Sequence, residues 1–299
     1  MEELIKILKF KEQELKAFLY DYLQKVGMNP ISEDGYLYAK GDIPILLVAH
    51  MDTVFYLPPE KIIIKNDSIL STSLKENVGI GGDDRCGVYA IMQLLKKYKP
   101  HVLFTEDEEI GLIGAKKAVA NLPKPDVKFI IEIDRRGSND CVFYNCGNEE
   151  FIKFIESFGF AFERGICSDI SALAPAWDLA AVNLSSGYYG EHTVFEQINF
   201  NELLQTIKKV GNILEKDYTH VLPYDYQEMI KTYSSYGMIK NFDDDIDYLL
   251  CNEEIYDEDT MKILKYLSYL TKSMDFSNLK NNKENSKIKN KRRGNRYDN

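Results

Sequence analysis

Short apolar runs that end near an acidic residue or a histidine constrain the fold of this chain most strongly. Four runs are typical of buried strands, and they cover residues 43–49, 102–104, 127–133 and 180–184. The first run stops at His50 and the third stops at Asp134. In a parallel sheet the carboxyl ends of the strands open onto a shared crevice, where ligands bind. The sequence therefore predicts polar side chains gathered at one edge of a sheet.

Amphipathic segments alternate with these runs. Helices are expected where apolar residues recur at helical spacing, over residues 1–26, 88–95, 114–122, 149–158 and 201–216. Strands that alternate with helices form a mostly parallel sheet whose two faces are covered. We therefore expect an α/β fold, a three-layer sandwich in which helices flank a mixed, mostly parallel sheet.

The composition excludes several classes of protein. A hydrophobic fraction of 44% suits a globular core, and a net charge of -10 argues against nucleic-acid binding by the folded body. The N-terminus lacks the features of a signal peptide, and no apolar run is long enough to span a membrane. The five cysteines form no CxxC pair, which disfavours a disulfide framework or a thiolate zinc knuckle. We expect a cytoplasmic protein without a membrane partner.

The chain changes character after residue 222. Residues 1–222 contain all the motifs described below and are expected to form the main domain. Residues 223–277 are acidic and have amphipathic spacing, which predicts a helical C-terminal extension. Residues 278–299 are rich in Asn, Lys and Arg, which is typical of a basic, disordered tail. Nucleic-acid binding by this tail is the weaker alternative.

Five short islands of acidic and histidine residues lie between positions 50 and 192. They read Ala49-His50-Met51-Asp52-Thr53, Gly82-Asp83-Asp84-Arg85, Asp107-Glu108-Glu109-Ile110-Gly111, Glu132-Ile133-Asp134 and Glu191-His192-Thr193. Imidazole and carboxylate groups bind zinc, and a carboxylate can bridge the two ions of a hydrolytic site. An unpaired carboxylate at Asp134, after a buried run, would carry a desolvation penalty that a cation removes. The islands together predict a two-metal hydrolytic site with one spare carboxylate.

Each island also has an ordinary structural explanation. His50 and Asp52 could be a polar pair in a surface loop, but in extended backbone they share a face, so Asp52 can orient a metal-binding imidazole. Asp83 could cap the helix that follows it. Glu108 and Glu109 could be solvated, although adjacent side chains that point apart can divide metal binding and proton transfer between them. The order of the islands favours the metal-binding interpretation.

In this order the islands resemble the superfamily of co-catalytic di-zinc exopeptidases, which includes the tripeptidase-T, glutamyl aminopeptidase and leucine aminopeptidase types. The resemblance covers roughly residues 40–215, and the ordered set of islands is more specific than any one island. It implies two Zn²⁺ ions, with Co²⁺ or Mn²⁺ as substitutes. It also implies the ligands of the two ions, which are His50, Asp83 and Asp134 for one and Asp83, Glu109 and His192 for the other.

The resemblance assigns further roles. Glu108 would be the general base that takes a proton from water and delivers it to the leaving amine. Asp52 would orient His50, and the bond between Asp83 and Asp84 would be cis, as in relatives. The stretch Ser168-Asp169-Ile170 resembles the substrate loop of the family, which makes Asp169 a candidate substrate-binding residue. Glu196 follows His192 at the expected short interval.

The chain also departs from some of these types. Too few residues separate the islands to hold the lid or dimerisation domain of many relatives, so we expect a minimal catalytic domain. Loss of the lid removes the arginine that binds a substrate carboxylate in carboxypeptidase and tripeptidase relatives. Arg135 or Arg136 could replace it, because arginine recognises carboxylates bidentately. Pairing of both residues with surface acids explains them equally well.

The expected activity is that of an aminopeptidase that acts on short peptides. A carboxypeptidase, or a deacylase or amidohydrolase that acts on N-acyl amino acids or other amides, would use the same metal ligands, and no sequence feature separates these alternatives. A catalytically silent binding scaffold is disfavoured because the ligand set and Glu108 are intact. The chain contains neither GxSxG nor HExxH, so a serine hydrolase and a single-zinc helical protease are not supported. The sequence leaves a homo-oligomer open.

Overall fold

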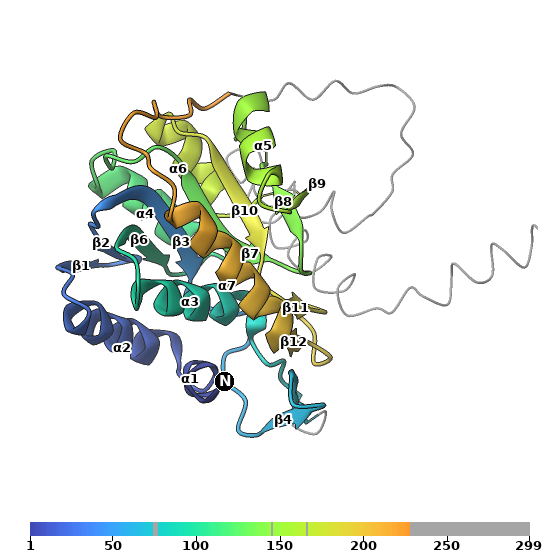
Figure 1. The fold of residues 1–299 in the computed structure, drawn as a ribbon. Helices are drawn as coiled ribbons and strands as arrows, with labels where there is room; N and C mark the ends of the chain where they lie inside the picture. The colour runs from blue at the N-terminus through green and yellow to red at the C-terminus, as the bar shows by residue number, and fades with distance from the viewer. Residues whose placement is uncertain (74–76, 145, 166, 228–299) are drawn as a thin grey trace, which may run out of the picture.

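A mixed sheet of eight strands forms the centre of the computed structural model, which describes residues 1–227 except 74–76, 145 and 166 (Figure 1). In spatial order the strands are β1 (Pro30–Glu33), β2 (Tyr36–Ala39), β6 (Pro100–Thr105), β3 (Ile43–His50), β7 (Ile130–Arg135), β10 (Ala181–Ser185), β8 (Asp140–Val142) and β9 (Ala161–Glu163). The central strands β6, β3, β7 and β10 are parallel. On one side β2 pairs antiparallel with β6 and β1 antiparallel with β2, and on the other β8 pairs antiparallel with β10 while β9 is parallel to β8. The mixed, mostly parallel sheet expected from the sequence is confirmed.

Helices cover both faces of this sheet. Side chains alternate along β3, so that Leu47 and Ala49 join one buried core while Leu46 and Val48 join the other. The first core includes side chains of α1 (Glu2–Ile7), α2 (Glu12–Lys25), α3 (Gly82–Leu95), α5 (Glu149–Glu156) and α7 (Phe200–Leu214). The second core includes side chains of α4 (Ile113–Asn121) and α6 (Ile170–Trp177). This arrangement confirms the three-layer sandwich.

A smaller antiparallel sheet lies beside α3. In spatial order its strands are β11 (Tyr188–Tyr189), β12 (Gln197–Asn199), β5 (Ile69–Thr72) and β4 (Ile62–Lys65). The sequence does not predict this sheet, because strands of two to four residues are too short to show a clear period. Its importance is positional, since His192 lies on the connection between β11 and β12.

The N-terminal region differs from the prediction in two ways. The single helix expected over residues 1–26 is wrong, because α1 and α2 are separate helices. Lys11 between them is extended (φ -70°, ψ 158°), and its N–H donates to the Glu14 carboxylate at 3.0 Å, which starts a new helix. The second difference is a β-hairpin of β1 and β2, which was not predicted from the sequence. Its Gly35 has φ +94°, a conformation that favours glycine.

Several predictions fall largely outside the described residues. Most of the acidic extension, residues 223–277, and all of the basic tail, residues 278–299, lie there, so both stay predictions. None of the described helices combines the length and apolar character that a membrane crossing needs. The compartment expected from cysteine usage also stays a prediction, because the described cysteines comprise buried free thiols at Cys86, Cys141 and Cys146 and a disulfide-bonded Cys167.

The first turn of α4 provides a test of this packing. A Cβ atom on Gly114 would lie 2.3 Å from the carbonyl oxygen of Gly35 and 2.4 Å from that of Glu106, and both are backbone atoms. The variant Gly114→Ala should therefore lower the free energy of unfolding by about 1–3 kcal/mol, as overpacked sites do. Urea denaturation measures the change.

Gly211 in α7 is the matched control. Its added Cβ would have no neighbour nearer than 3.5 Å outside its own helix. Gly211→Ala should therefore leave the free energy of unfolding unchanged or raise it, by up to about 1 kcal/mol. Equal effects of the two substitutions would contradict the tight contact at Gly114.

Candidate metal centre

The register of the sheet places His50 beside Asp134. Strands β3 and β7 are parallel neighbours in which Val48 pairs with Glu132. Side chains two residues further along a strand lie on the same face of the sheet. His50 and Asp134, each two residues beyond this pair, therefore lie side by side on that face. Both residues are buried, and Nε2 of His50 lies 3.6 Å from Oδ1 of Asp134. The two side chains thus meet at the carboxyl edge of the sheet, as the sequence predicted.

Asp83 reaches the same point from the start of α3. Gly81, with φ +71°, precedes this helix, and the peptide bond between Asp83 and Asp84 is cis, as the resemblance implied. Oδ1 of Asp83 lies 3.0 Å from Nε2 of His50, and Oδ2 lies 3.2 Å from Nε2 of His192. A carboxylate that offers a separate oxygen to each of two imidazoles has the geometry of a bridging ligand.

Glu109 completes the gathering of potential ligands. It lies on the turn after β6, and its carboxylate is 2.9 Å from Nε2 of His192. Ligand atoms of His50, Asp83 and Glu109 all lie within 4.8 Å of one another. Nitrogen and oxygen donors at this spacing fit a zinc ion, so the residues present are suited to a metal.

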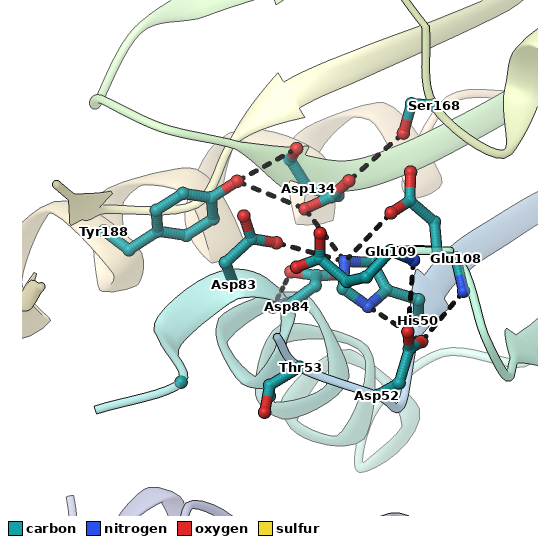
Figure 2. Close-up of polar contacts among 12 residues, drawn as sticks. His50, Asp52, Thr53, Asp83, Asp84, Glu108, Glu109, Asp134, Ser168 and Tyr188 are labelled. Carbon is teal, nitrogen blue, oxygen red and sulfur yellow. Dashed lines mark hydrogen bonds and ion pairs between the residues drawn. The ribbon is translucent and has the colours of Figure 1, made fainter. Parts of the chain in front are cut away.

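Asp52 and Glu108 approach the two different ring nitrogens of His50 (Figure 2). A carboxylate oxygen of Asp52 lies 3.3 Å from Nδ1 of His50, the ring nitrogen that faces away from Asp83. The backbone N–H groups of Glu108 and Glu109 donate to the two oxygens of Asp52 at 3.1 Å each. Glu108 places its own carboxylate 4.0 Å from Nε2 of His50. Asp52 therefore contacts both the imidazole and the turn that carries the two glutamates.

The electrostatics of the site are dominated by buried negative charge. Burial and the nearby charge of Asp83 raise the pKa of Asp134 to about 7. Burial also raises the pKa of Glu108 well above its usual value. Burial lowers the pKa of His50, but the carboxylates of Asp134 and its other acidic neighbours outweigh this effect and raise the pKa overall. Divalent cations placed among these groups would stabilise them in their charged, metal-binding forms.

Three side chains that the sequence analysis did not assign to this role hold Asp134 in place. The hydroxyl of Tyr188 lies 3.2 Å from Oδ1, and the hydroxyl of Ser168 donates to Oδ2 at 3.1 Å. The side-chain amide of Asn183 accepts the N–H of Asp134 at 2.8 Å and donates to its carbonyl at 3.0 Å. No local pattern could have revealed these contacts, because they come from loops and strands distant in sequence.

Glu196 and Asp169 occupy buried positions near the centre. The carboxylate of Glu196 accepts the N–H of Gly81 at 2.8 Å and that of Asp83 at 3.0 Å, which fixes the loop that carries Asp83. One oxygen of Asp169 accepts a hydrogen bond from the Thr105 hydroxyl. The other Asp169 oxygen has no hydrogen-bond partner among the described residues. Substrate binding by Asp169 stays a prediction.

The two arginines proposed for carboxylate recognition already have contacts on the protein. Arg136 forms an ion pair with Glu191 at 2.8 Å. Arg135 donates to the carbonyl of Arg164 at 3.4 Å. For Arg136 the contact agrees with the alternative in which the arginines pair with nearby acids. Their part in substrate binding stays a prediction.

The fold agrees with that of several solved peptidases. Aminopeptidase PepT from Bacillus cereus has a TM-score of 0.59 and 14% identity, over 71% of this chain and 96% of its own. A tripeptidase from Staphylococcus aureus has a TM-score of 0.56 and 15% identity, over 71% of this chain and 95% of its own. TET1 peptidase from Pyrococcus horikoshii, which can assemble into a tetrahedron or a large octahedral shell, has a TM-score of 0.55 and 16% identity, over 71% of this chain and 98% of its own.

These similarities identify the fold. No family model matches the chain, and no curated protein matches it. The chain therefore has the fold of peptidases such as these, and the case for its chemistry depends on its own side chains.

The hydroxyl of Tyr188 offers a test of the metal centre. The variant Tyr188→Phe removes the hydroxyl that contacts both the carbonyl and a carboxylate oxygen of Asp134. It should weaken zinc binding by about 10-fold or more, because residues that orient metal ligands are typically worth 10–100-fold in affinity. Competition with a chromophoric chelator measures the affinity.

Tyr189 is the matched control, since its hydroxyl donates to Glu202 instead. Tyr189→Phe should bind zinc as tightly as the unmodified protein. The positioning role of Tyr188 is wrong if both variants keep full zinc affinity.

Proposed function

We propose that this protein is a di-zinc exopeptidase that hydrolyses terminal peptide bonds of short peptides, acting as an aminopeptidase. The observation that carries the proposal is the carboxylate of Asp83, whose two oxygens face His50 and His192 separately. A single-metal site has no need of such a bridge. The shared fold with solved aminopeptidases and tripeptidases supports the same conclusion.

The proposed ligand sets follow the measured contacts. His50, Asp83 and Asp134 would hold one zinc ion, and Asp83, Glu109 and His192 would hold the other. The imidazole-to-carboxylate distances within these sets range from 2.9 to 3.6 Å. When bound, zinc supplies Lewis-acid polarisation of the scissile carbonyl and lowers the pKa of water.

Glu108 is the proposed proton carrier. Its N–H donates to Asp52, and its carboxylate lies 4.0 Å from Nε2 of His50, beside the proposed metal ligands. Because burial raises its pKa, the carboxylate is a better proton acceptor than an exposed glutamate. It would take a proton from the attacking water and deliver it to the leaving amine.

Two substitutions separate metal binding from proton transfer. Glu108→Gln should leave the zinc content unchanged and lower kcat by about 10²–10⁴-fold, the range for loss of a general base. Asp83→Asn should lower the occupancy of both zinc ions, because both share this carboxylate. Metal analysis by mass spectrometry and peptide turnover are measured on the same preparations. A full zinc content in the Asp83→Asn protein would contradict the bridging role.

Product analysis decides which terminus is attacked. A pool of short peptides incubated with the zinc-loaded protein should lose residues stepwise from the N-terminus, as followed by mass spectrometry. The ion pair of Arg136 with Glu191 supports this outcome, since it occupies a candidate carboxylate-binding group. Loss of residues from the C-terminus would restore the carboxypeptidase alternative. If all peptides stay intact, N-acyl amino acids become the substrates to test.

A further inference from the structure

A pocket of about 510 Å³ adjoins the candidate metal centre. It lies between the connection of α1 to α2, the loop after β3 and the turn after β6. Two of its lining residues, Asp52 and Glu109, also belong to the centre. Its volume falls within the range of small-molecule binding sites. The pocket is therefore continuous with the candidate site and large enough to hold a substrate side chain.

The walls of this pocket are apolar and exposed. Apolar lining side chains include Phe10, Val54, Tyr56, Leu57, Pro58 and Ile110. Val54 is 45% exposed, Leu57 51% and Ile110 53%, although large hydrophobic side chains are generally buried in this fold. Apolar side chains that gather in the open around a pocket indicate a binding site for an apolar group.

Acidic groups outnumber basic ones around the pocket. The acids that line it are Glu12, Glu14, Asp52, Asp107 and Glu109, and the bases are Lys11 and Arg85. Burial raises the pKa of Glu12 to about 7, with further contributions from the charges of Asp52, Glu106 and Asp107. Glu109 would hold zinc, so the charges that a substrate carboxylate would meet here are mainly those of Glu12, Glu14 and Asp107, which would repel it. An uncharged apolar side chain would meet no such repulsion.

We propose that this pocket binds a large apolar side chain of the peptide substrate, next to the scissile bond, and discriminates against an acidic one. The inference rests on the proposed function and adds the class of substrate. Leucine-like and phenylalanine-like residues suit the apolar walls, and glutamate and aspartate do not suit the acidic surroundings. The occupant is a peptide residue, because the pocket shares Asp52 and Glu109 with the site where the bond would be cleaved.

The test compares alanine tripeptides in which one position at a time is leucine, phenylalanine or glutamate. At one position beside the cleaved bond, kcat/KM for leucine should exceed that for alanine by about 10-fold or more, as expected for a filled apolar pocket. The tripeptide with glutamate at that position should have a kcat/KM at least about 10-fold lower than that of trialanine. Equal values for leucine, alanine and glutamate at every position would overturn the inference.

The variant Leu57→Asp places a charge in the pocket. It should reduce the ratio of kcat/KM for the leucine peptide to kcat/KM for trialanine by about 10-fold. Leu222→Asp is the matched control, because Leu222 is 82% exposed and does not line the pocket. If Leu57→Asp fails to fold, Leu57→Ala makes the same comparison. If Leu57→Asp and Leu222→Asp both keep the full preference for leucine over alanine, the inference is also overturned.

The two proposals fail in distinguishable ways. If the zinc-loaded protein cleaves no tripeptide, the proposed function fails, and calorimetric binding of the intact tripeptides then tests the pocket alone. Tighter binding of the leucine peptide than of trialanine, lost in Leu57→Asp, would support the pocket, and equal binding would overturn it. If Leu57→Asp instead dissociates an oligomer without changing selectivity, this surface is a contact between copies of the chain and the inference is wrong.

Discussion

The rest of the site depends on the carboxylate of Asp83 between the imidazoles of His50 and His192. Burying a charged group is costly unless partners compensate it, and here each partner comes from a different part of the chain. Glu196 accepts the N–H of Asp83 and so fixes the backbone behind the carboxylate. The end of β3, the start of α3 and the connection from β11 to β12 must therefore fold correctly together for any one of these groups to be stabilised.

Each of the two sheets positions a different part of the site. In the main sheet the parallel strands β3 and β7 end at the same edge, so that His50 lies beside Asp134. The small sheet pairs β12 with β5 and holds the connection that carries His192 close to α3. Asp52 then joins the loop after β3 to the turn after β6 through the N–H groups of Glu108 and Glu109.

Much of the fold and most of the central site could be predicted from the sequence. The buried runs of β3, β6, β7 and β10 and the helices between them are strong local patterns. His50, Glu109 and Asp134 stand at or shortly after the ends of such runs. Other features were missed for a physical reason. The hairpin of β1 and β2 and the small sheet consist of short strands stabilised by partners distant in sequence. The break at Lys11 depends on a local hydrogen bond to Glu14 that the apolar spacing does not reveal.

The sequence by itself determined which residue types stand at the ends of the buried strands, because apolar runs and the acids that follow them are local properties of the chain. It also determined that these acids include a His-x-Asp pair and adjacent glutamates. Only the tertiary structure decided that the oxygens of Asp83 face two imidazoles, that Tyr188 holds Asp134, and that an apolar pocket opens beside Glu109. These features are contacts between distant segments, and packing rather than local pattern sets their distances.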